Sequence, residues 1–354
     1  MAERVLMKGN EAMSEAVIQA GCRHFFGYPI TPQNEVCAYF SKRMPQVDGT
    51  YLQAESEVAA INMVLGAAAA GVRAITSSSS PGISLKTEGI SYMVGSDLPC
   101  LIVNVQRGGP GLGGIQPSQA DYNQATKAPG HGDAHVLVLA PASVQEMVDF
   151  PALAFELAER YRMPAMILAD GLLGQMMEPV VFKDVQINQV EKPWATNGHE
   201  NKRPPNVINS LFLDPVVLEQ KVLARAERYA YIKEHEVIHE GYLLDDAELV
   251  VVAYGATARI CRSAINEARD MGLKVGLLRP ITLWPFPVQQ IRQLTQQAKH
   301  FLAVEMSMGQ MIDDVRLAVQ GAAPVSFFGR TGGMIPTPQE VLAKIKEILG
   351  GEQV

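Results

Sequence analysis

The chain has 354 residues, 47% of them hydrophobic, and a formal net charge of −7. This length is enough for two domains with hydrophobic cores of their own. The 30 lysines and arginines form no dense block, which argues against a nucleic-acid partner. No apolar run reaches the roughly 18 residues of a membrane span, and the N-terminus lacks the apolar region of a signal peptide. We therefore expect a cytoplasmic protein that does not cross a membrane.

Strands and helices alternate along most of the chain. The predicted buried strands cover residues 100–105, 136–139, 165–168, 249–253, 275–278 and 301–304, and a short strand is predicted at 50–53. The predicted helices are 11–20, 58–70, 144–161, 216–236 and 341–349. Asn10 is the expected cap of the first, Ser143 with Glu146 caps 144–161, and Thr337 with Glu340 caps 341–349. Such alternation is typical of open parallel sheets with helices on both faces, an α/β fold.

The alternation is interrupted between about residue 183 and residue 246. This stretch contains Lys192-Pro193-Trp194, Pro204-Pro205 and the charged helix predicted near 216–236. We expect residues 186–245 to form a linker that packs on a partner, between a first domain at 1–185 and a second domain at 246–354.

Four cysteines are scattered along the chain at Cys22, Cys37, Cys100 and Cys261, without a Cys-x-x-Cys pair. A structural zinc site or a cubane iron–sulfur cluster needs clustered thiolates. We therefore expect no metal site in this chain and interpret the cysteines as small core residues. If the protein carries out electron chemistry, the clusters belong to another chain.

An acidic residue, Glu57, stands between the predicted strand 50–53 and an alanine-rich helix. The small alanine side chains leave room for a flat ligand or for a close partner helix. Two interpretations are open: a functional acid at a cofactor site, or an ordinary first-turn carboxylate favoured by the helix dipole. Glu55, two residues earlier, is the competing candidate for the functional acid.

The segment Gly109–Gly114 matches the pattern Gly-x-Gly-x-x-Gly and follows a predicted strand. A dinucleotide-binding fingerprint requires a helix to begin at once, with a ribose-binding acid about 20 residues later. Here Ile115-Gln116-Pro117-Ser118 opposes a helix, and no second strand ends in an acid. We interpret the segment as an irregular loop whose backbone approaches a ligand closely.

Two polar residues border such loops. Arg107 lies between a predicted strand and the glycine loop, where it would either grip a carboxylate ligand or close a structural ion pair. Thr31 precedes Pro32, and this pair predicts a helix with Thr31 as its N-cap and Pro32 as its first residue. A helix N-terminus also attracts anions, so the two roles of Thr31 are compatible.

Together these segments resemble the α subunit of the thiamine diphosphate-dependent 2-oxoacid:ferredoxin oxidoreductases. The matching motifs are 27–32, 57–60, 76–85, 106–114, 254–255, 279–287 and 329–338. They lie in both predicted domains. The likeness is greatest to the type that acts on 3-methyl-2-oxobutanoate and other branched-chain 2-oxoacids, and the 2-oxoglutarate type is next.

The resemblance implies a fold and a set of partners. The first domain would resemble the pyrimidine-binding domain of thiamine enzymes, and the second the C-terminal domain of transketolase. A β subunit would hold the diphosphate, its Mg²⁺ and an iron–sulfur cluster. A ferredoxin-like δ subunit would carry further [4Fe-4S] clusters, and a γ subunit would complete the complex. The reaction would consume a 2-oxoacid and coenzyme A, release CO2 and reduce ferredoxin.

The resemblance also implies roles for individual residues. Glu57 would hydrogen-bond N1′ of the aminopyrimidine and favour the imino form, whose nitrogen takes the proton from thiazolium C2. Thr31 and Arg107 would bind the carboxylate of the 2-oxoacid and hold its keto carbon over C2. The other residues expected at the cofactor pocket are Pro29, Ile30, Ser79, Pro81, Gly82 and Gly109.

Three alternatives remain at this point. The complex would be a 2-oxoglutarate:ferredoxin oxidoreductase that forms succinyl-CoA, or the chain would serve a transketolase-like or lipoamide-linked enzyme. Alternatively, the chain would be a non-catalytic assembly subunit that has kept the fold.

Overall fold

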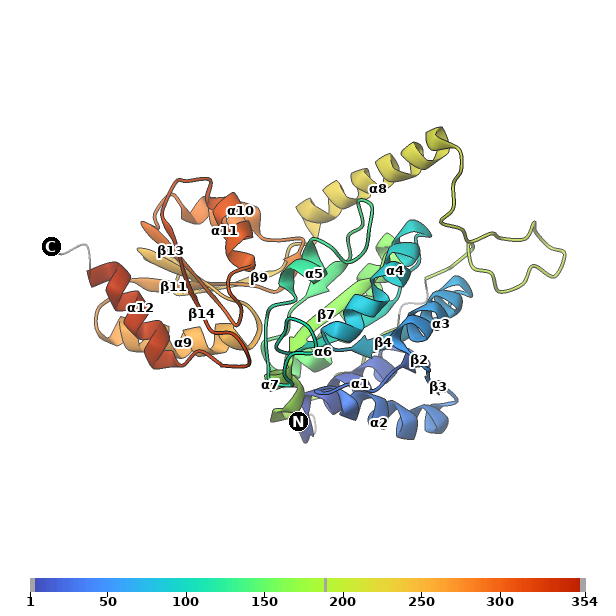
Figure 1. The fold of residues 1–354 in the computed structure, drawn as a ribbon, viewed down its shortest axis with the longest axis horizontal. Helices are drawn as coiled ribbons and strands as arrows, with labels where there is room; N and C mark the ends of the chain where they lie inside the picture. Colours follow the sequence, from blue (N-terminus) through green and yellow to red (C-terminus); the bar gives the residue numbers. More distant parts are fainter. Residues whose placement is uncertain (1–3, 188–189, 351–354) are drawn as a thin grey trace.

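The computed structural model describes residues 4–187 and 190–350. Two mostly parallel sheets with flanking helices lie next to each other, and a helical arm projects from the larger part (Figure 1). The larger sheet has seven strands in the order β12-β6-β7-β5-β4-β2-β3, and the smaller has five in the order β14-β13-β10-β11-β9. The predicted α/β class with parallel sheets is confirmed.

The strands of the seven-stranded sheet are β2 (His24–Gly27), β3 (Thr50–Gln53), β4 (Ala74–Ser78), β5 (Leu101–Gln106), β6 (Leu137–Leu139), β7 (Ala165–Asp170) and β12 (Thr282–Trp284). Those of the five-stranded sheet are β9 (His239–Tyr242), β10 (Leu249–Val252), β11 (Val275–Pro280), β13 (His300–Glu305) and β14 (Val325–Gly329). A separate antiparallel ribbon pairs β1 (Val5–Lys8) with β8 (Met177–Val180).

The helices that precede the arm are α1 (Gly9–Gln19), α2 (Asn34–Arg43), the 3-10 turn Met44–Val47, α3 (Glu57–Ala69), α4 (Pro81–Gly95), α5 (Tyr122–Thr126), α6 (Val144–Tyr161) and α7 (Gly171–Gln175). The later helices are α8 (Pro215–His235), α9 (Gly255–Asp270), α10 (Val288–Leu294), α11 (Met311–Val319) and α12 (Pro338–Gly350). In the larger part α1 packs against α2 and α6, and α3 packs against α4. In the smaller part α9 packs against α12, and α10 against α11.

Two predicted helix starts are wrong. Asn10 does not cap the first helix, because α1 already begins at Gly9 and the Asn10 side chain donates 2.9 Å to the carbonyl of Pro32. Thr31 does not cap the next helix, because α2 begins at Asn34 with Gln33 as its N-cap. The predicted cap of α6 is confirmed, since Ser143 Oγ accepts from the Glu146 N–H at 3.1 Å.

The two sheets are joined by a shared core and by polar contacts. One cluster of buried side chains extends from β5 and β7 to Val250 and Phe301 of the smaller sheet. The strand β12 belongs to the second half of the sequence, but it pairs antiparallel with β6 of the larger sheet. Arg279 donates to both carboxylate oxygens of Glu146, at 2.8 and 2.7 Å. These contacts fix how the two parts lie relative to each other.

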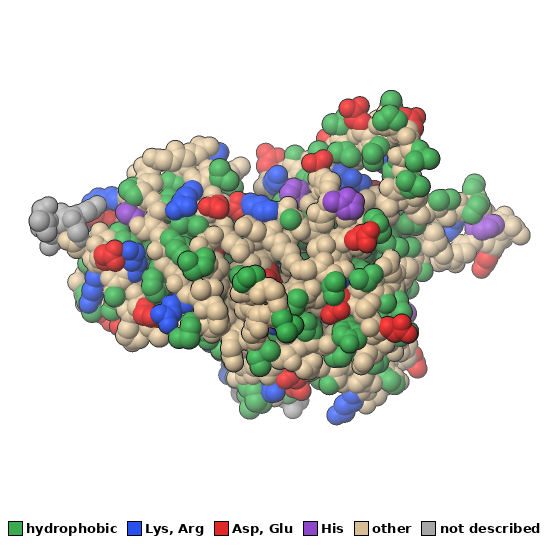
Figure 2. Space-filling view, viewed as in Figure 1, with side chains coloured by type: hydrophobic (Ala, Val, Ile, Leu, Met, Phe, Trp, Pro, Cys, Tyr) green, Lys and Arg blue, Asp and Glu red, His purple; other side chains and the backbone are tan. Residues whose placement is uncertain are grey.

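The helix predicted near 216–236 is present as α8, and it projects beyond the body of the molecule together with the preceding loop (Figure 1). Hydrophobic side chains are visible along this projection (Figure 2). In this part of the chain, Val207 and Leu213 are 81% and 87% exposed. Among the described residues, no helix is both long and apolar enough to span a bilayer.

Candidate active site

The carboxyl ends of the parallel strands β2, β3, β4 and β5 meet at one edge of the larger sheet. The loop 28–33 follows β2, Glu57 follows β3, the turn 79–82 follows β4, and Arg107 follows β5. Ligands of open α/β sheets bind beyond such edges. The fold therefore brings every segment that the sequence marked as a candidate to the same edge.

Glu57 is the first residue of α3 and is buried, with 7% of its surface exposed. Ser56 caps this helix, because its side chain accepts from the Ala59 N–H at 3.2 Å. A Cβ added at Gly82 would lie 2.8 Å from Glu57 Oε1 and 2.1 Å from Ser78 Oγ. The Glu57 carboxylate therefore lies against the backbone of Gly82, whereas Glu55 is exposed to solvent.

The hydroxyls of Ser78 and Ser79 are buried and have no hydrogen-bond partner among the described residues. Ser78 is the last residue of β4, and Ser79 follows it, two residues before α4 begins at Pro81. Buried polar atoms in native proteins are nearly always hydrogen-bonded, so an ordered water or a ligand would complete the bonding of these two hydroxyls. One of them, Ser78, shares the environment of Gly82 with Glu57.

Arg107 is buried and donates to two backbone carbonyls. Its Nη1 lies 2.9 Å from the oxygen of Thr31, and its Nη2 lies 3.1 Å from the oxygen of Leu112. Its Nε is buried without a partner. The ion pair considered for Arg107 is absent among the described residues, and the structure instead brings Arg107 and Thr31 together.

The glycine loop after β5 is irregular, as predicted, and no helix begins before α5. Its start and end are closed by hydrogen bonds from Gly108 N to Gln116 O, 3.0 Å, and from Gly114 N to Gly108 O, 2.8 Å. Gly109 lies exposed within it. The loop contacts Gly333 of the second half of the chain, where an added Cβ would lie 2.4 Å from the Cβ of Gln116.

A buried polar network that the sequence did not reveal connects β4 to β5. Ser80 Oγ donates to Asp121 Oδ2 at 2.6 Å and accepts from the Arg107 N–H at 3.0 Å. Asn104 Nδ2 donates to the same Asp121 oxygen at 2.9 Å. Burial raises the pKa of Asp121, and the hydrogen bonds from Ser80 and Asn104 oppose this effect. The network ties Arg107 to the turn that carries Gly82.

The loop that contains Pro29, Ile30 and Thr31 is fixed by Gln33, another residue that the sequence did not single out. The Gln33 N–H donates to the Ile30 carbonyl at 2.9 Å. Its side-chain oxygen accepts from Ser77 Oγ of β4 at 2.7 Å. Pro29, Ile30 and Thr31 are half-buried at this edge.

Thr31 borders a cavity of about 660 Å³ between the two parts of the molecule. Its walls include the apolar side chains of Ile115, Leu172, Met176 and Ile335. Glu35 lies in the same wall, and neither lysine nor arginine belongs to the lining that the structure describes.

The four cysteines are buried and unpaired. Burial raises the pKa of Cys22 to about 12 and that of Cys37 to about 11, so these thiols stay protonated at neutral pH. This confirms their assignment as core residues. Across residues 4–187 and 190–350, no group of three or more His, Cys, Asp or Glu side chains is placed to hold a metal ion.

Comparison with known proteins identifies the two halves of the chain. Residues 15–242 match the thiamine diphosphate-binding model of pyruvate flavodoxin/ferredoxin oxidoreductases, and residues 247–341 match core domain II of pyruvate:ferredoxin oxidoreductase. The chain is 50% identical over 346 residues to the ketoisovalerate oxidoreductase subunit VorB of Methanothermobacter thermautotrophicus, covering 98% of each protein. It is 35% identical over 381 residues to the 2-oxoglutarate synthase subunit KorA of the same organism, covering 98% of this chain and 99% of that subunit.

Solved structures agree with these matches. A chain of the 2-oxoglutarate:ferredoxin oxidoreductase from Magnetococcus marinus, solved with 2-oxoglutarate, coenzyme A and succinyl-CoA, superposes with a TM-score of 0.87 at 26% identity. The present chain spans 65% of its length, and 98% of the present chain is covered. A split-gene transketolase superposes with a TM-score of 0.60 at 12% identity, which shows a shared fold alone.

The larger sheet is that of a thiamine diphosphate-binding domain, and the chain shares its fold with a transketolase. The chain belongs to the 2-oxoacid:ferredoxin oxidoreductase family. Members of this family are oxidoreductases that act on the oxo group of their donors, and the relatives are named as subunits of larger enzymes. The family and fold expected from the sequence are thereby confirmed.

Proposed function

We propose that this chain is the α subunit of a complex that oxidatively decarboxylates a branched-chain 2-oxoacid, such as 3-methyl-2-oxobutanoate, to an acyl-CoA and CO2 while it reduces ferredoxin. The observation that carries the proposal is the position of Glu57, buried at the start of α3 against Gly82. The full-length likeness to a ketoisovalerate oxidoreductase subunit supports it.

The residues at the sheet edge fit the aminopyrimidine of thiamine diphosphate. The buried carboxylate of Glu57 is a hydrogen-bond partner for a ring nitrogen, and Ser78 and Ser79 offer unpartnered hydroxyls beside it. Any side chain at Gly82 would collide with Ser78 and Glu57, so the glycine allows both groups to keep their positions at the pocket. When bound, this cofactor supplies a carbon nucleophile that attacks the keto carbon of the substrate.

Within this proposal, each residue has a defined role. Glu57 holds the proton at N1′ of the pyrimidine. Thr31 contributes its hydroxyl and Arg107 its unpartnered Nε–H to the carboxylate of the oxoacid. Pro29 and Ile30 shape the loop beside them, and the turn at Ser79, Pro81 and Gly82, together with Gly109 of the glycine loop, encloses the pocket.

The choice of substrate class is supported by the cavity beside Thr31. Its apolar wall suits the branched aliphatic chain of the substrate. Glu35 in this lining pairs with Lys8 at 3.3 Å, and no lysine or arginine belongs to the described lining, so the cavity offers no free cation for the second carboxylate of 2-oxoglutarate. The greater identity to VorB, 50%, than to KorA, 35%, supports the same choice.

We propose further that a β subunit holds the diphosphate, Mg²⁺ and an iron–sulfur cluster, and that γ and δ subunits and additional [4Fe-4S] clusters complete the path to ferredoxin. The division into a thiamine domain at 1–185, a partner-packing segment at 186–245 and a transketolase-like domain at 246–354 is part of the proposal. The exposed apolar residues Val207, Leu211 and Leu213 support a docking role for the middle segment.

The decisive experiment compares Glu57→Gln with the matched control Glu55→Gln, each in the complex purified through a tag on this chain. The oxoacid-dependent reduction of a low-potential dye is expected to fall by about 100-fold or more in Glu57→Gln. The control lies two residues away at an exposed position and is expected to keep its activity. Near-normal turnover of an assembled Glu57→Gln complex would refute the assignment.

A substrate panel tests the oxoacid class on the same preparation. The proposal requires kcat/KM for 3-methyl-2-oxobutanoate to exceed that for 2-oxoglutarate. A reversed preference would replace the branched-chain assignment by the 2-oxoglutarate alternative.

A further inference from the structure

Lys86 is a fully buried lysine in the middle of α4, with 0% of its surface exposed. It lies one helical turn after Gly82, the residue whose backbone meets the Glu57 carboxylate. Lysine is almost never fully buried unless a charged partner compensates it. Nothing in the reaction described above uses this side chain.

The ammonium group of Lys86 is directed at the first turn of α3. Its Nζ lies 3.4 Å from the backbone carbonyl oxygen of Glu57. Among the described residues Lys86 forms no ion pair, and its hydrogen bond goes to a backbone oxygen. The amine therefore contacts Glu57 through the backbone carbonyl, without a direct bond to its carboxylate.

Two titratable groups face Lys86 from the helices packed around it, namely Glu57 of α3 and Cys37 of α2. Burial lowers the pKa of Lys86 to about 8, and the negative charge of Glu57 opposes this lowering. Burial raises the pKa of Cys37 to about 11, so this thiol is uncharged at neutral pH. Glu57 is thus the one anionic neighbour of Lys86 among these groups.

A buried ammonium without a close carboxylate destabilises the folded state, because the interactions in the interior do not offset the free energy of removing the charge from water. An apolar side chain of similar length would pack at this position without that penalty. A purely structural role therefore does not account for a lysine here, whereas a requirement for positive charge behind Glu57 does.

We propose that Lys86 is a positioning residue for Glu57: its ammonium holds the first turn of α3 through the Glu57 carbonyl and favours the negative charge on the carboxylate that faces the cofactor. The inference rests on the proposed role of Glu57 and extends it to a second residue. Its consequence is that proton transfer at the cofactor depends on the charge state of Lys86.

The test uses the purified complex carrying Lys86→Met, which removes the charge, or Lys86→Arg, which keeps it. Ile90→Val is the matched control, since Ile90 is fully buried one turn further along α4 and carries no charge. The first measurement is the rate at which the C2 proton of bound thiamine diphosphate exchanges with deuterium, followed by NMR without substrate. The second is the cofactor dissociation constant from calorimetric titration.

We expect Lys86→Met to slow C2 exchange by about tenfold or more, which corresponds to a change of about one unit in the proton affinity of Glu57. The variants Lys86→Arg and Ile90→Val should stay near the wild-type rate. The pH profile gives an independent result. Wild-type exchange should decline above about pH 8, as Lys86 loses its proton, and in Lys86→Arg this decline should move to higher pH.

The inference would be overturned if Lys86→Met exchanged its C2 proton at the wild-type rate. It would also be overturned if the decline of the exchange rate at high pH occurred at the same pH in Lys86→Arg as in the wild type. Glu57→Gln separates this failure from that of the proposed function. If Glu57→Gln is slow and Lys86→Met is normal, the role of Lys86 alone is refuted. If Glu57→Gln also exchanges at the wild-type rate, the assignment of Glu57 is refuted, and the role of Lys86 with it.

Discussion

The guanidinium of Arg107 donates to the backbone carbonyl oxygen of Thr31 across 2.9 Å, although the two residues are far apart in the sequence. The side chain therefore joins the loop after β2 to the strand β5. Because the arginine uses the carbonyl of Thr31, the threonine hydroxyl stays available for a different partner. The two proposed substrate-binding residues are thus positioned by each other and are separable by mutation.

Arg107→Lys is expected to raise KM for the 2-oxoacid by about 10- to 100-fold, the equivalent of losing one hydrogen bond to a charged group. Lysine keeps the charge but lacks the planar fork that serves Thr31, Leu112 and a ligand at once. Steady-state kinetics with varied oxoacid measure the change. Arg316→Lys, at an exposed position on α11, is the control and should leave KM unchanged. An unaltered KM in Arg107→Lys would exclude a carboxylate-binding role.

Thr31→Val is expected to lower kcat/KM by about tenfold, because it removes the hydroxyl while keeping both the shape and the carbonyl that anchors Arg107. Among the described residues, this hydroxyl accepts from the exposed side chain of Asn34, at 3.1 Å. Thr31→Ser restores the hydroxyl and should recover most of the activity. Equal kinetics of the valine and serine variants would show that the hydroxyl does not reach the substrate.

Gly82→Ala should weaken thiamine diphosphate binding by at least about tenfold and lower stability by about 1–3 kcal/mol. The added Cβ would lie 2.1 Å from Ser78 Oγ and 2.8 Å from Glu57 Oε1, so both side chains must move. Gly66→Ala in α3 is the matched control, because nothing lies within 4 Å of its added Cβ. The control should be neutral or stabilising. Calorimetric cofactor titration and thermal melting distinguish the two variants.

Much of the fold could be predicted from local pattern. The buried strands 100–105 and 165–168 are continuous apolar runs, and a fully buried parallel strand needs nothing else to be recognised. The edge strands β9 and β12 were not predicted. Both strands are short and antiparallel to their neighbours. The strand β12 pairs with β6, which lies far from it along the chain. Such pairing depends on tertiary contacts that a local pattern does not contain.

The candidate site shows the same division. Local motifs and the family resemblance pointed to Thr31, Glu57, Gly82 and Arg107 as candidates, and the parallel strands bring their segments to one edge. The helix start at Thr31 was predicted wrongly because Gln33 bonds to Ser77 and so delays α2 to Asn34. This is a long-range contact.

Lys86 carries a local signal in the sequence. It occupies the same face of its helix as Ile83 and Ile90, which are also buried, and a lysine within an apolar helical stripe is unusual. The network of Ser80, Asn104 and Asp121, by contrast, joins residues from separate segments. Its members carry no local pattern that would have grouped them.

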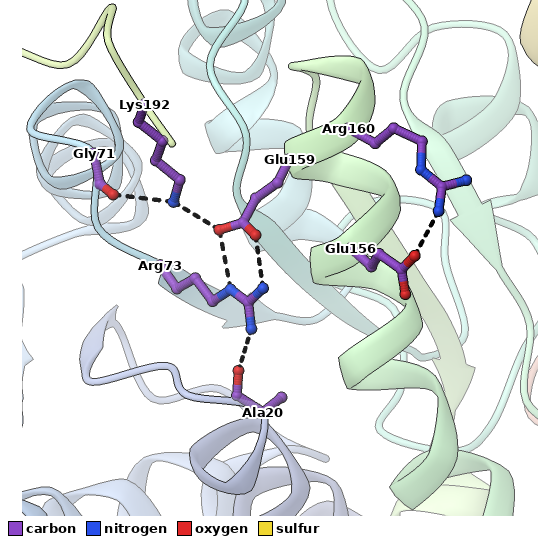
Figure 3. A network of polar contacts seen from close by, with 7 residues as sticks. All are labelled: Ala20, Gly71, Arg73, Glu156, Glu159, Arg160 and Lys192. Atoms are coloured by element: carbon purple, nitrogen blue, oxygen red, sulfur yellow. Dashed lines mark hydrogen bonds and ion pairs between the residues drawn. The ribbon is translucent and has the colours of Figure 1, made fainter. Parts of the chain in front are cut away.

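Two ion-pair clusters on α6 differ sharply in environment (Figure 3). Glu159 is buried and accepts from Arg73 Nε and Nη2, at 3.0 and 2.6 Å, and from Lys192 Nζ at 2.6 Å. Through Lys192 it ties the start of the projecting segment to the thiamine domain, while Arg73 also donates to Ala20 O (Figure 3). Glu156, one turn earlier, pairs with Arg160 at the surface, where both side chains are about half exposed.

Glu159→Gln is therefore expected to cost about 3 kcal/mol, because it leaves Arg73 and Lys192 without their anion. Glu156→Gln should change stability by less than about 1 kcal/mol.

Burial opposes the ionisation of Glu159, but the hydrogen bonds from Arg73 and Lys192 outweigh it and hold its pKa below the ordinary value of 4.5. The stabilising contribution is thus complete above about pH 4.5 and is lost as the pH falls through the lowered folded-state pKa. Urea denaturation at several pH values measures this contribution. The difference in the free energy of unfolding between the wild type and Glu159→Gln should become smaller in acid. A difference that stays constant down to the lowest accessible pH would contradict the expected pH dependence.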